Sequence, residues 1–279
     1  MKYIRNVVKY FSASVIVFVT VFQLGCSSSQ ESVKNVPLEE DRKLGLQVVK
    51  EIESKPSEYP ILPESQAPKA YQHLRRITNT ILNGGAVKNR AAFEWKVSII
   101  KDDKTLNAFC TPGGYIYVYT GIIKYLDSED QLAGVLGHEI AHADCRHSQQ
   151  QQQSAQKTGI LATLADLGGR IFFGTTLIGT AANVGANLAL LNYSREDETE
   201  ADINSVHYLY NTEYDARGAA RFFEKMVKAG NGGGPVFMST HPDPGNRVQK
   251  ITAEWQKMGG KVGQTFPDRY KELVASLPK

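Results

Sequence analysis

The 279-residue sequence is poor in cysteine and has no surplus of charge beyond its N-terminus. Three cysteines are too few for a disulfide scaffold, and no Cys-x-x-Cys pair suggests a cysteine-based zinc site. The 32 basic residues exceed the 29 acidic ones by three; Lys2, Arg5 and Lys9 supply that excess, and no acid precedes Cys26. The near-neutral remainder lacks the clustered cationic surface that nucleic-acid binding requires, so we expect no nucleic-acid partner.

The composition is otherwise that of a globular protein. With 42% hydrophobic and 22% charged residues, the chain is neither collagen-like, nor a coiled coil, nor largely disordered. Its length permits one large domain or two small ones, with enough apolar residues for a substantial core. We find no internal repeat and predict one domain over residues 37–279.

The N-terminus has the features of an export signal. Three basic residues precede an uncharged stretch over residues 11–24, which is shorter than the about 20 residues of a transmembrane helix. Cys26 follows in a context similar to the end of a lipoprotein signal, although Gln23 stands where such signals usually carry leucine. We therefore predict a signal peptide over residues 1–25, lipidation of Cys26, and a polar tether over residues 26–36.

The alternative is a plain signal anchor in which Cys26 is incidental. Both interpretations place the remainder in the periplasm or at an envelope surface, and Ser27 after Cys26 favours a lipid anchor in the outer membrane. In this oxidising compartment Cys110 and Cys145 either form a disulfide or remain two buried thiols, and the sequence leaves both open.

The hydrophobic pattern predicts an α+β fold that is mainly helical. Residues 93–99 and 115–119 alternate and are rich in aromatic and β-branched side chains, so we expect two strands of a small sheet. Helical spacing of apolar residues predicts further helices over residues 38–54, 67–83, 194–211, 215–229 and 246–258.

Ser128 and Gln131 form a capping-box pattern that opens a helix running through at least His147. On such a helix His147 lies on the face opposite His138, as a solvated or structural histidine, and five glutamines after it extend the helix into solvent. The Gly- and Ala-rich residues 160–191 form either a membrane-inserting hairpin or buried, lid-forming helices, and we favour the second.

The motif His138-Glu139-Ile140-Ala141-His142 lies inside this helix. Four residues advance an α-helix by about 400°, so the two imidazoles point the same way and can occupy two corners of a tetrahedral zinc site. Glu139 lies about 60° from His142 by the same geometry, within reach of the open corner. Its carboxylate is therefore the candidate general base for a hydrolytic water.

A third ligand must come from elsewhere in the chain. No glutamate lies between Glu139 and Glu196, which excludes a glutamate about twenty residues downstream. The pattern H-E-x-x-H-x-x-G-x-x-H also fails, because Cys145 and Ser148 stand at its glycine and third histidine. Asp166 is a further candidate, but the acidic stretch that begins at Glu196 is the stronger one.

Two pairs of acids in this stretch share a helical face. Glu198 and Asp202 are four residues apart, and so are Glu196 and Glu200 on another side of the same helix. One acid of a pair can bind zinc while the other orients a ligand histidine. Spacing alone does not decide which face looks towards the metal.

Four short segments occur in order and together span most of residues 38–251: Asn107 to Phe109 with Pro112 to Val118, Leu132 to His142, Ser194 to Asp202, and Thr240 to Pro242 with Arg247. In this order they resemble zinc metallopeptidases of the HtpX and CAAX-prenyl-protease type, in particular their periplasmic lipoprotein members. The resemblance implies a gluzincin-like fold in which Glu198 is the third ligand and Asp202 orients a ligand histidine.

The resemblance also implies that residues 115–119 form an edge strand before the active helix. An extended substrate can add to such an edge as one more strand, which suits cleavage of chains with many different sequences. An ordinary internal strand at this place stays open as the alternative. The substrate-binding residues would be Asn107, Ala108, Gly114, Tyr115, Ile116 and Tyr117.

By the same resemblance, His241 has one of two roles. It is either a fourth zinc ligand that keeps the enzyme latent or a hydrogen-bond donor to the oxyanion of the tetrahedral intermediate. A turn histidine before Pro242 is the remaining interpretation. Arg247 either supports the same oxyanion or simply pairs with an acid.

We therefore expect a membrane-tethered endopeptidase with one Zn²⁺ per chain that cleaves unfolded or misfolded cell-envelope polypeptides, with Glu139 as general base. The competing hypothesis is a chaperone or assembly factor for outer-membrane proteins, working with the envelope assembly machinery. In that case the zinc site is latent or structural, and His241 closes the coordination sphere.

Overall fold

A computed structural model describes residues 33–157, 191, 193–229, 237, 240–242 and 246–278. The predicted signal peptide, Cys26, the first part of the tether, Asp166 and nearly all of residues 160–191 lie outside these residues. None of the helices within the described ranges is long and apolar enough to cross a membrane.

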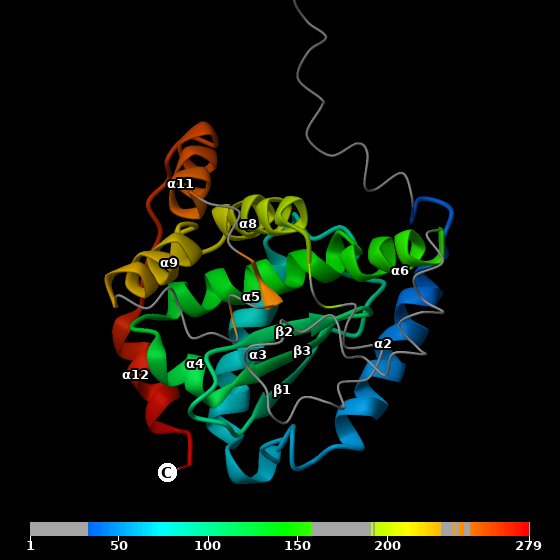
Figure 1. The fold of residues 1–279 in the computed structure, drawn as a ribbon. Helices are drawn as coiled ribbons and strands as arrows, with labels where there is room; N and C mark the ends of the chain where they lie inside the picture. The colour runs from blue at the N-terminus through cyan, green and yellow to red at the C-terminus, as the bar shows by residue number, and fades with distance from the viewer. Residues whose placement is uncertain are drawn as a thin grey trace, which may run out of the picture.

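The described chain is mainly helical with a small sheet, so the predicted fold class is confirmed. Three strands follow the first two helices, and the remaining helices come after the sheet (Figure 1). The elements are α2 (Leu38–Glu53), η1 (Glu64–Gln66), α3 (Pro68–Asn83), β1 (Lys96–Ile100), β2 (Ala108–Thr111), β3 (Tyr115–Tyr119), α4 (Thr120–Tyr125), α5 (Glu129–Asp144), α6 (His147–Lys157), α8 (Arg195–Tyr210), α9 (Gly218–Lys228), α11 (Arg247–Lys257) and α12 (Pro267–Ala275).

The strand order in the sheet is β1-β3-β2, which corrects the expected position of the edge. β3 pairs in parallel with β1 and antiparallel with β2, so Tyr115–Tyr119 is the internal strand. β2 is the edge strand on the side of α5. The chain returns from β2 to the middle of the sheet through Gly113 and Gly114, whose φ angles of 78° and 92° suit glycine.

The first strand starts later than predicted. Trp95 has a φ angle of 47°, which interrupts the extended backbone, so β1 begins at Lys96 rather than Phe93. A Cβ on Gly114 would lie 2.8 Å from the backbone nitrogen of Trp95, so the turn and this bend are packed against each other.

The active helix α5 lies between the sheet and α8 (Figure 1). All sixteen of its residues are buried, because β2, α3, α8 and α9 surround it. Gly134 permits the close approach of α9, since a Cβ there would lie 2.1 Å from the backbone nitrogen of Ala219. The main core therefore forms around α5 and holds its motif rigidly.

The N-terminus of α5 is not closed by the predicted capping box. Ser128 is the N-cap residue, but its hydroxyl donates to Asp130 Oδ1 at 2.6 Å, and its side chain accepts no bond from the helix backbone. Gln131 instead accepts a hydrogen bond from the backbone nitrogen of Asp127 at 3.0 Å. Short polar side chains near a helix start have several such partners within reach.

The prediction of one helix running through His147 is also wrong. α5 ends at Asp144, Arg146 adopts a φ angle of 64°, and α6 begins at His147. Arg146 is anchored in this conformation by its side chain, whose Nε donates to Asp41 Oδ2 of α2 at 3.0 Å. The first glutamines after the break are buried rather than solvated: Gln150 donates to the backbone oxygen of Cys145 at 2.8 Å.

Cys110 and Cys145 are buried free thiols, so of the two alternatives the disulfide is wrong. Cys110 lies in β2 within the main core, whereas Cys145 caps the C-terminus of α5. The sulfur of Cys145 accepts a hydrogen bond from Asn204 Nδ2 of α8 at 3.4 Å. The two sulfurs thus pack in different environments.

Candidate metal centre

The metal centre is formed where α5 packs against α8. His138 and His142 project from consecutive turns of α5, as their spacing predicts. The structure also decides which face of α8 looks inward: Glu198 and Asp202 are fully buried, whereas Glu196 is exposed. A capping box between Ser194 and Asp197 fixes the first turn of α8 and so sets this rotation.

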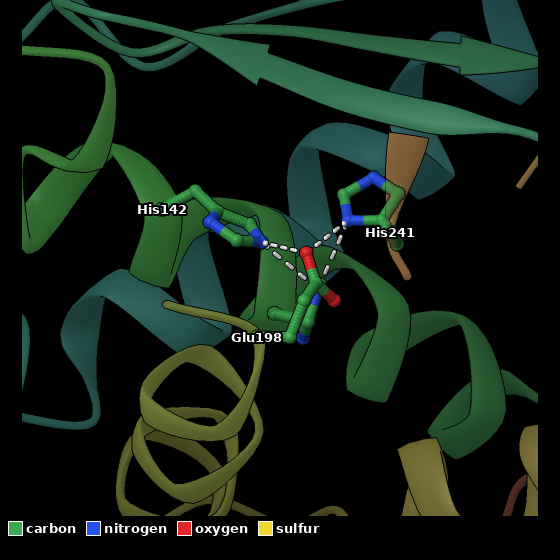
Figure 2. Close-up of side chains that lie close together, drawn as sticks. His142, Glu198 and His241 are labelled. Carbon is green, nitrogen blue, oxygen red and sulfur yellow. Dashed lines mark hydrogen bonds and ion pairs between the residues drawn. The ribbon is translucent and has the colours of Figure 1, made fainter. Parts of the chain in front are cut away.

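Four donor side chains converge in the buried space between these helices. The Nε2 atoms of His138 and His142 are 3.0 Å apart. Glu198 Oε2 lies 3.3 Å from the first of them, and Glu198 Oε1 lies 3.3 Å from the second. His241 joins from the segment after α9, with its Nδ1 3.0 Å from Glu198 Oε1. Figure 2 shows the Glu198 carboxylate between His142 and His241.

The chemistry of these donors fits a zinc ion. His138 Nδ1 lies 2.9 Å from Asp202 Oδ1, so this nitrogen carries the hydrogen and leaves a lone pair on Nε2. A lone pair therefore faces the carboxylate oxygens of Glu198, an arrangement that a metal cation bound between them would stabilise. Donor atoms of a tetrahedral site with zinc–nitrogen bonds of about 2.0–2.1 Å lie about 3.3 Å apart. The separations here are close to this, from 3.0 to 3.3 Å.

Glu139 lies beside this cluster and is not among its donors. Its carboxylate is buried, and neither oxygen has a hydrogen-bond partner among the residues that the structure describes. His241 Nε2 lies 3.4 Å from Glu139 Oε1. A buried carboxylate without a hydrogen bond is costly, which is consistent with a functional task beside the metal cluster.

The pKa values of the two glutamates of the centre are shifted in opposite directions. Burial raises the pKa of Glu139 above its ordinary value. Burial would also raise the pKa of Glu198, but its interactions with His241 and His138 hold it well below its usual range. Opposite pKa shifts of two neighbouring carboxyl groups are typical of a site in which one carboxylate binds a cation and the other takes up and releases a proton.

Comparison with known proteins identifies the family. The sequence matches Peptidase family M48 over residues 68–255. The chain belongs to this family. The predicted resemblance is thereby confirmed, and the domain is that of a zinc metalloendopeptidase with a centre for one zinc ion.

Several proteins of known name are similar to this M48 chain. "Mitochondrial metalloendopeptidase OMA1" of Schizosaccharomyces pombe is 30% identical over 82% of the chain and 64% of its own length. The "Beta-barrel assembly-enhancing protease" of Escherichia coli is 27% identical over 64% of the chain and 38% of its own length. "Metalloprotease LoiP" of Escherichia coli is 30% identical over 66% of the chain and 71% of its own length. The chain thus spans less than two thirds of the first two relatives.

Arg247 contacts two acids of the M48 centre, Asp202 and Glu198. Its Nε donates to Asp202 Oδ2 at 2.8 Å and its Nη2 to Asp202 Oδ1 at 2.7 Å, while Nη2 is 3.1 Å from Glu198 Oε2. The guanidinium also stacks on Phe223, 3.9 Å from the ring centre. Burial would raise the pKa of Asp202, but the charge of Arg247 lowers it. Of the two predicted roles, the geometry therefore shows the pairing with an acid.

The residue that the sequence argument missed is His147. It is fully buried, and its Nδ1 lies 2.8 Å from Nδ1 of His142. Tyr193, which precedes α8, stacks on His142 with ring centres 3.7 Å apart. The expected position of His147 opposite His138 fails because the helix breaks at Arg146. Arginine gives no turn signal, so no feature of the sequence announces this break.

The predicted substrate-binding residues divide between two strands. Asn107 and Ala108 lie at the start of the edge strand β2, beside α5. Gly114 is in the turn, and the other three, Tyr115, Ile116 and Tyr117, are in β3. Both edges of β3 are already paired, so its backbone cannot accept an added strand.

Proposed function

We propose that this protein is a membrane-tethered zinc endopeptidase that cleaves unfolded or misfolded cell-envelope polypeptides. The observation that supports it best is the buried group of His138, His142 and Glu198 beside the carboxylate of Glu139, whose oxygens have no hydrogen-bond partner among the described residues. Two imidazoles and one carboxylate are the ligand set of hydrolytic zinc sites that keep an open position.

In the proposed mechanism, His138, His142 and Glu198 hold the zinc ion. When bound, zinc polarises the scissile carbonyl and lowers the pKa of water. Glu139 takes a proton from the attacking water on one of its two free oxygens and returns it to the nitrogen of the leaving amine. Its raised pKa suits the first step, because a more basic carboxylate takes the proton from water more readily.

His241 acts in this proposal as a fourth donor that closes the centre until substrate arrives. Its Nδ1 lies 3.3 Å from Nε2 of His138 and 3.0 Å from Glu198 Oε1, within the donor cluster. Its Nε2 faces Glu139, so the ring also covers the base. The alternative role, donation to the oxyanion, requires this ring to turn away from Glu198.

The substrate adds to β2 rather than to β3. The backbone nitrogen of Tyr119 donates to the oxygen of Asn107, so Asn107 faces β3. Residues alternate along an antiparallel strand, so Ala108 and Cys110 turn their backbone groups away from β3. The Ala108 nitrogen donates to Asn107 Oδ1 at 3.0 Å, so a substrate would use the Ala108 oxygen and the backbone groups of Cys110, or displace this side chain. An extended polypeptide there would run along α5, next to His138 and Glu139.

The proposed tether and location rest on the N-terminal sequence. The predicted signal over residues 1–25 and the lipid on Cys26 would hold the domain at the periplasmic face of the outer membrane. A protein extracted from membranes should lack residues 1–25 and carry acyl groups on Cys26 in mass spectrometry. Retention of residues 1–25, or an unmodified Cys26, would refute this part of the proposal.

A second candidate function is a chaperone or assembly factor for outer-membrane proteins with a latent zinc site. The position of His241 inside the donor cluster favours it, because four protein donors leave no open corner. One relative is itself named for β-barrel assembly.

Replacing Glu139 by glutamine separates the two functions. The enzyme hypothesis predicts a stably folded variant with unchanged zinc content that has lost proteolysis of casein, an unfolded substrate, by at least about 10²-fold. Glu196→Gln, on the exposed face of α8, is the matched control and should keep full activity. Retained proteolysis in Glu139→Gln rejects the mechanism, and rescue of a deletion strain by this variant supports the chaperone.

A further inference from the structure

His147 lies at the junction of α5 and α6, where it is enclosed by the two helices and α8. We propose that His147 is a positioning residue. Its ring accepts a hydrogen bond from the zinc ligand His142 and donates one to an acid of α8. The proposal rests on the metal centre of the proposed function, and it adds a residue that touches neither metal nor substrate.

The orientation of His142 fixes the direction of this interaction. Its Nε2 faces the donor cluster, 3.3 Å from Glu198 Oε1, so its Nδ1 points away from the metal. Nδ1 of His147 is 2.8 Å from it, and of two ring nitrogens at this distance one must donate and the other accept. Since Nε2 of His142 keeps its lone pair for zinc, Nδ1 of His142 carries the hydrogen and donates it.

The tautomer of His147 follows from that of His142. With Nδ1 as acceptor, the neutral ring carries its hydrogen on Nε2. That atom points at α8, 3.4 Å from Glu200 Oε2 and 3.8 Å from Asp197 Oδ1. A chain of two hydrogen bonds therefore runs from the ligand to a carboxylate at the partly exposed side of α8, and each bond orients the next ring.

The helix break places His147 at this position. Five residues along a continuous helix would turn His147 by about 140° away from His142. The left-handed conformation of Arg146, held by Asp41, brings the ring back beside its ligand. Tyr193 stacks on the face of His142 and fixes the plane in which it can donate.

The main rival is a second metal site. The atoms of Cys145, His147 and Glu200 lie within 4.8 Å of one another. Each of them already has a partner in the protein: the Cys145 sulfur accepts from Asn204, and His147 Nε2 faces Glu200. We therefore assign His147 and Glu200 to the support of His142, and the stoichiometry of zinc separates the two interpretations.

The test uses the purified full-length protein and two substitutions of similar size. His147→Leu removes the acceptor, whereas His147→Asn keeps an acceptor oxygen close to the position of Nδ1. Zinc dissociation constants come from competition with a chelator of known affinity, with circular dichroism melting as a check of folding. We expect one zinc per chain, a rise of about 10- to 100-fold in Kd for His147→Leu, and a Kd for His147→Asn close to that of the wild type.

An unchanged Kd in a folded His147→Leu overturns the inference and leaves the proposed function standing. Two zinc ions per wild-type chain, one of them lost in His147→Leu, overturn it in favour of the second site. A wild type that binds no zinc overturns both this inference and the proposed function.

A measurement on the wild type keeps the inference testable if His147→Leu does not fold. In a ¹H–¹⁵N spectrum of the zinc-loaded protein, His147 should be the neutral tautomer with its hydrogen on Nε2. A hydrogen on Nδ1 of His147 contradicts the proposed chain of hydrogen bonds.

Discussion

The two histidine ligands stand one turn apart on the same helix, yet they are supported in different ways. His138 is oriented by Asp202, which is itself paired through two hydrogen bonds with Arg247, and all three are buried. His142 is oriented by the neutral ring of His147 and the face of Tyr193.

The difference lies in where the charge is placed. On the His138 side, full charges are buried and compensate one another, so removing one takes away most of the compensation of its partner, at a cost of about 3–5 kcal/mol. On the His142 side, the charges of Asp197 and Glu200 lie at a partly exposed surface, and the buried contacts are neutral. A neutral hydrogen bond contributes only about 0.5–1.5 kcal/mol. We therefore expect loss of the support by Asp202 and Arg247 to lower both stability and zinc affinity. Loss of the support by His147 and Tyr193 should lower mainly zinc affinity.

The largest effect should come from Asp202→Ala. This variant removes the partner of His138 Nδ1 and two hydrogen bonds of the buried guanidinium of Arg247, which keeps its contact with Glu198. The free energy of unfolding of the zinc-free protein should fall by about 3–5 kcal/mol in urea titrations, and zinc affinity by about 10- to 100-fold. Glu196→Ala is the surface control on the same helix, and an equal loss in both variants would contradict the account.

Arg247→Lys should have an intermediate effect. A single ammonium group cannot reproduce the two parallel bonds to Asp202, although it keeps the charge. The loss of one charge-assisted hydrogen bond predicts a decrease of about 1.5–3 kcal/mol in the free energy of unfolding, measured in the same way. A variant as stable as the wild type would show that the paired hydrogen bonds from the guanidinium to Asp202 do not contribute to stability.

Tyr193→Leu should have the smallest effect. It removes the stacked ring on His142 and the contact of its hydroxyl with Ser148 at 3.2 Å, and keeps an apolar side chain in the space. We expect about 1 kcal/mol of lost stability and a smaller rise in zinc Kd than in His147→Leu. A loss as large as that of Asp202→Ala would erase the proposed difference between the two supports.

The sequence predicts this centre well where the chemistry lies within one helix. The spacing of His138 and His142 places both rings on one side of α5, and the observed cluster agrees. The sequence does not decide which face of α8 looks inward, because Glu198 with Asp202 and Glu196 with Glu200 have the same spacing. Only the packing of α8 on α5 distinguishes the two pairs.

Features that depend on contacts between distant segments could not be predicted. β3 lies in the middle of the sheet because β1 pairs with it, although β2 stands between the two strands in the sequence. The local pattern of residues does not encode this pairing. The break at Arg146 depends on an ion pair with Asp41, more than a hundred residues earlier. The burial of His147 follows from that break and was missed for the same reason.

Zinc content tests the central claim most directly. Metal analysis of the purified protein, together with chelator competition, should find one zinc ion per chain in the wild type and loss of tight binding in Glu198→Ala. Wild-type protein that holds no zinc, or a Glu198→Ala variant that binds zinc as tightly as the wild type, would contradict the proposed centre of His138, His142 and Glu198.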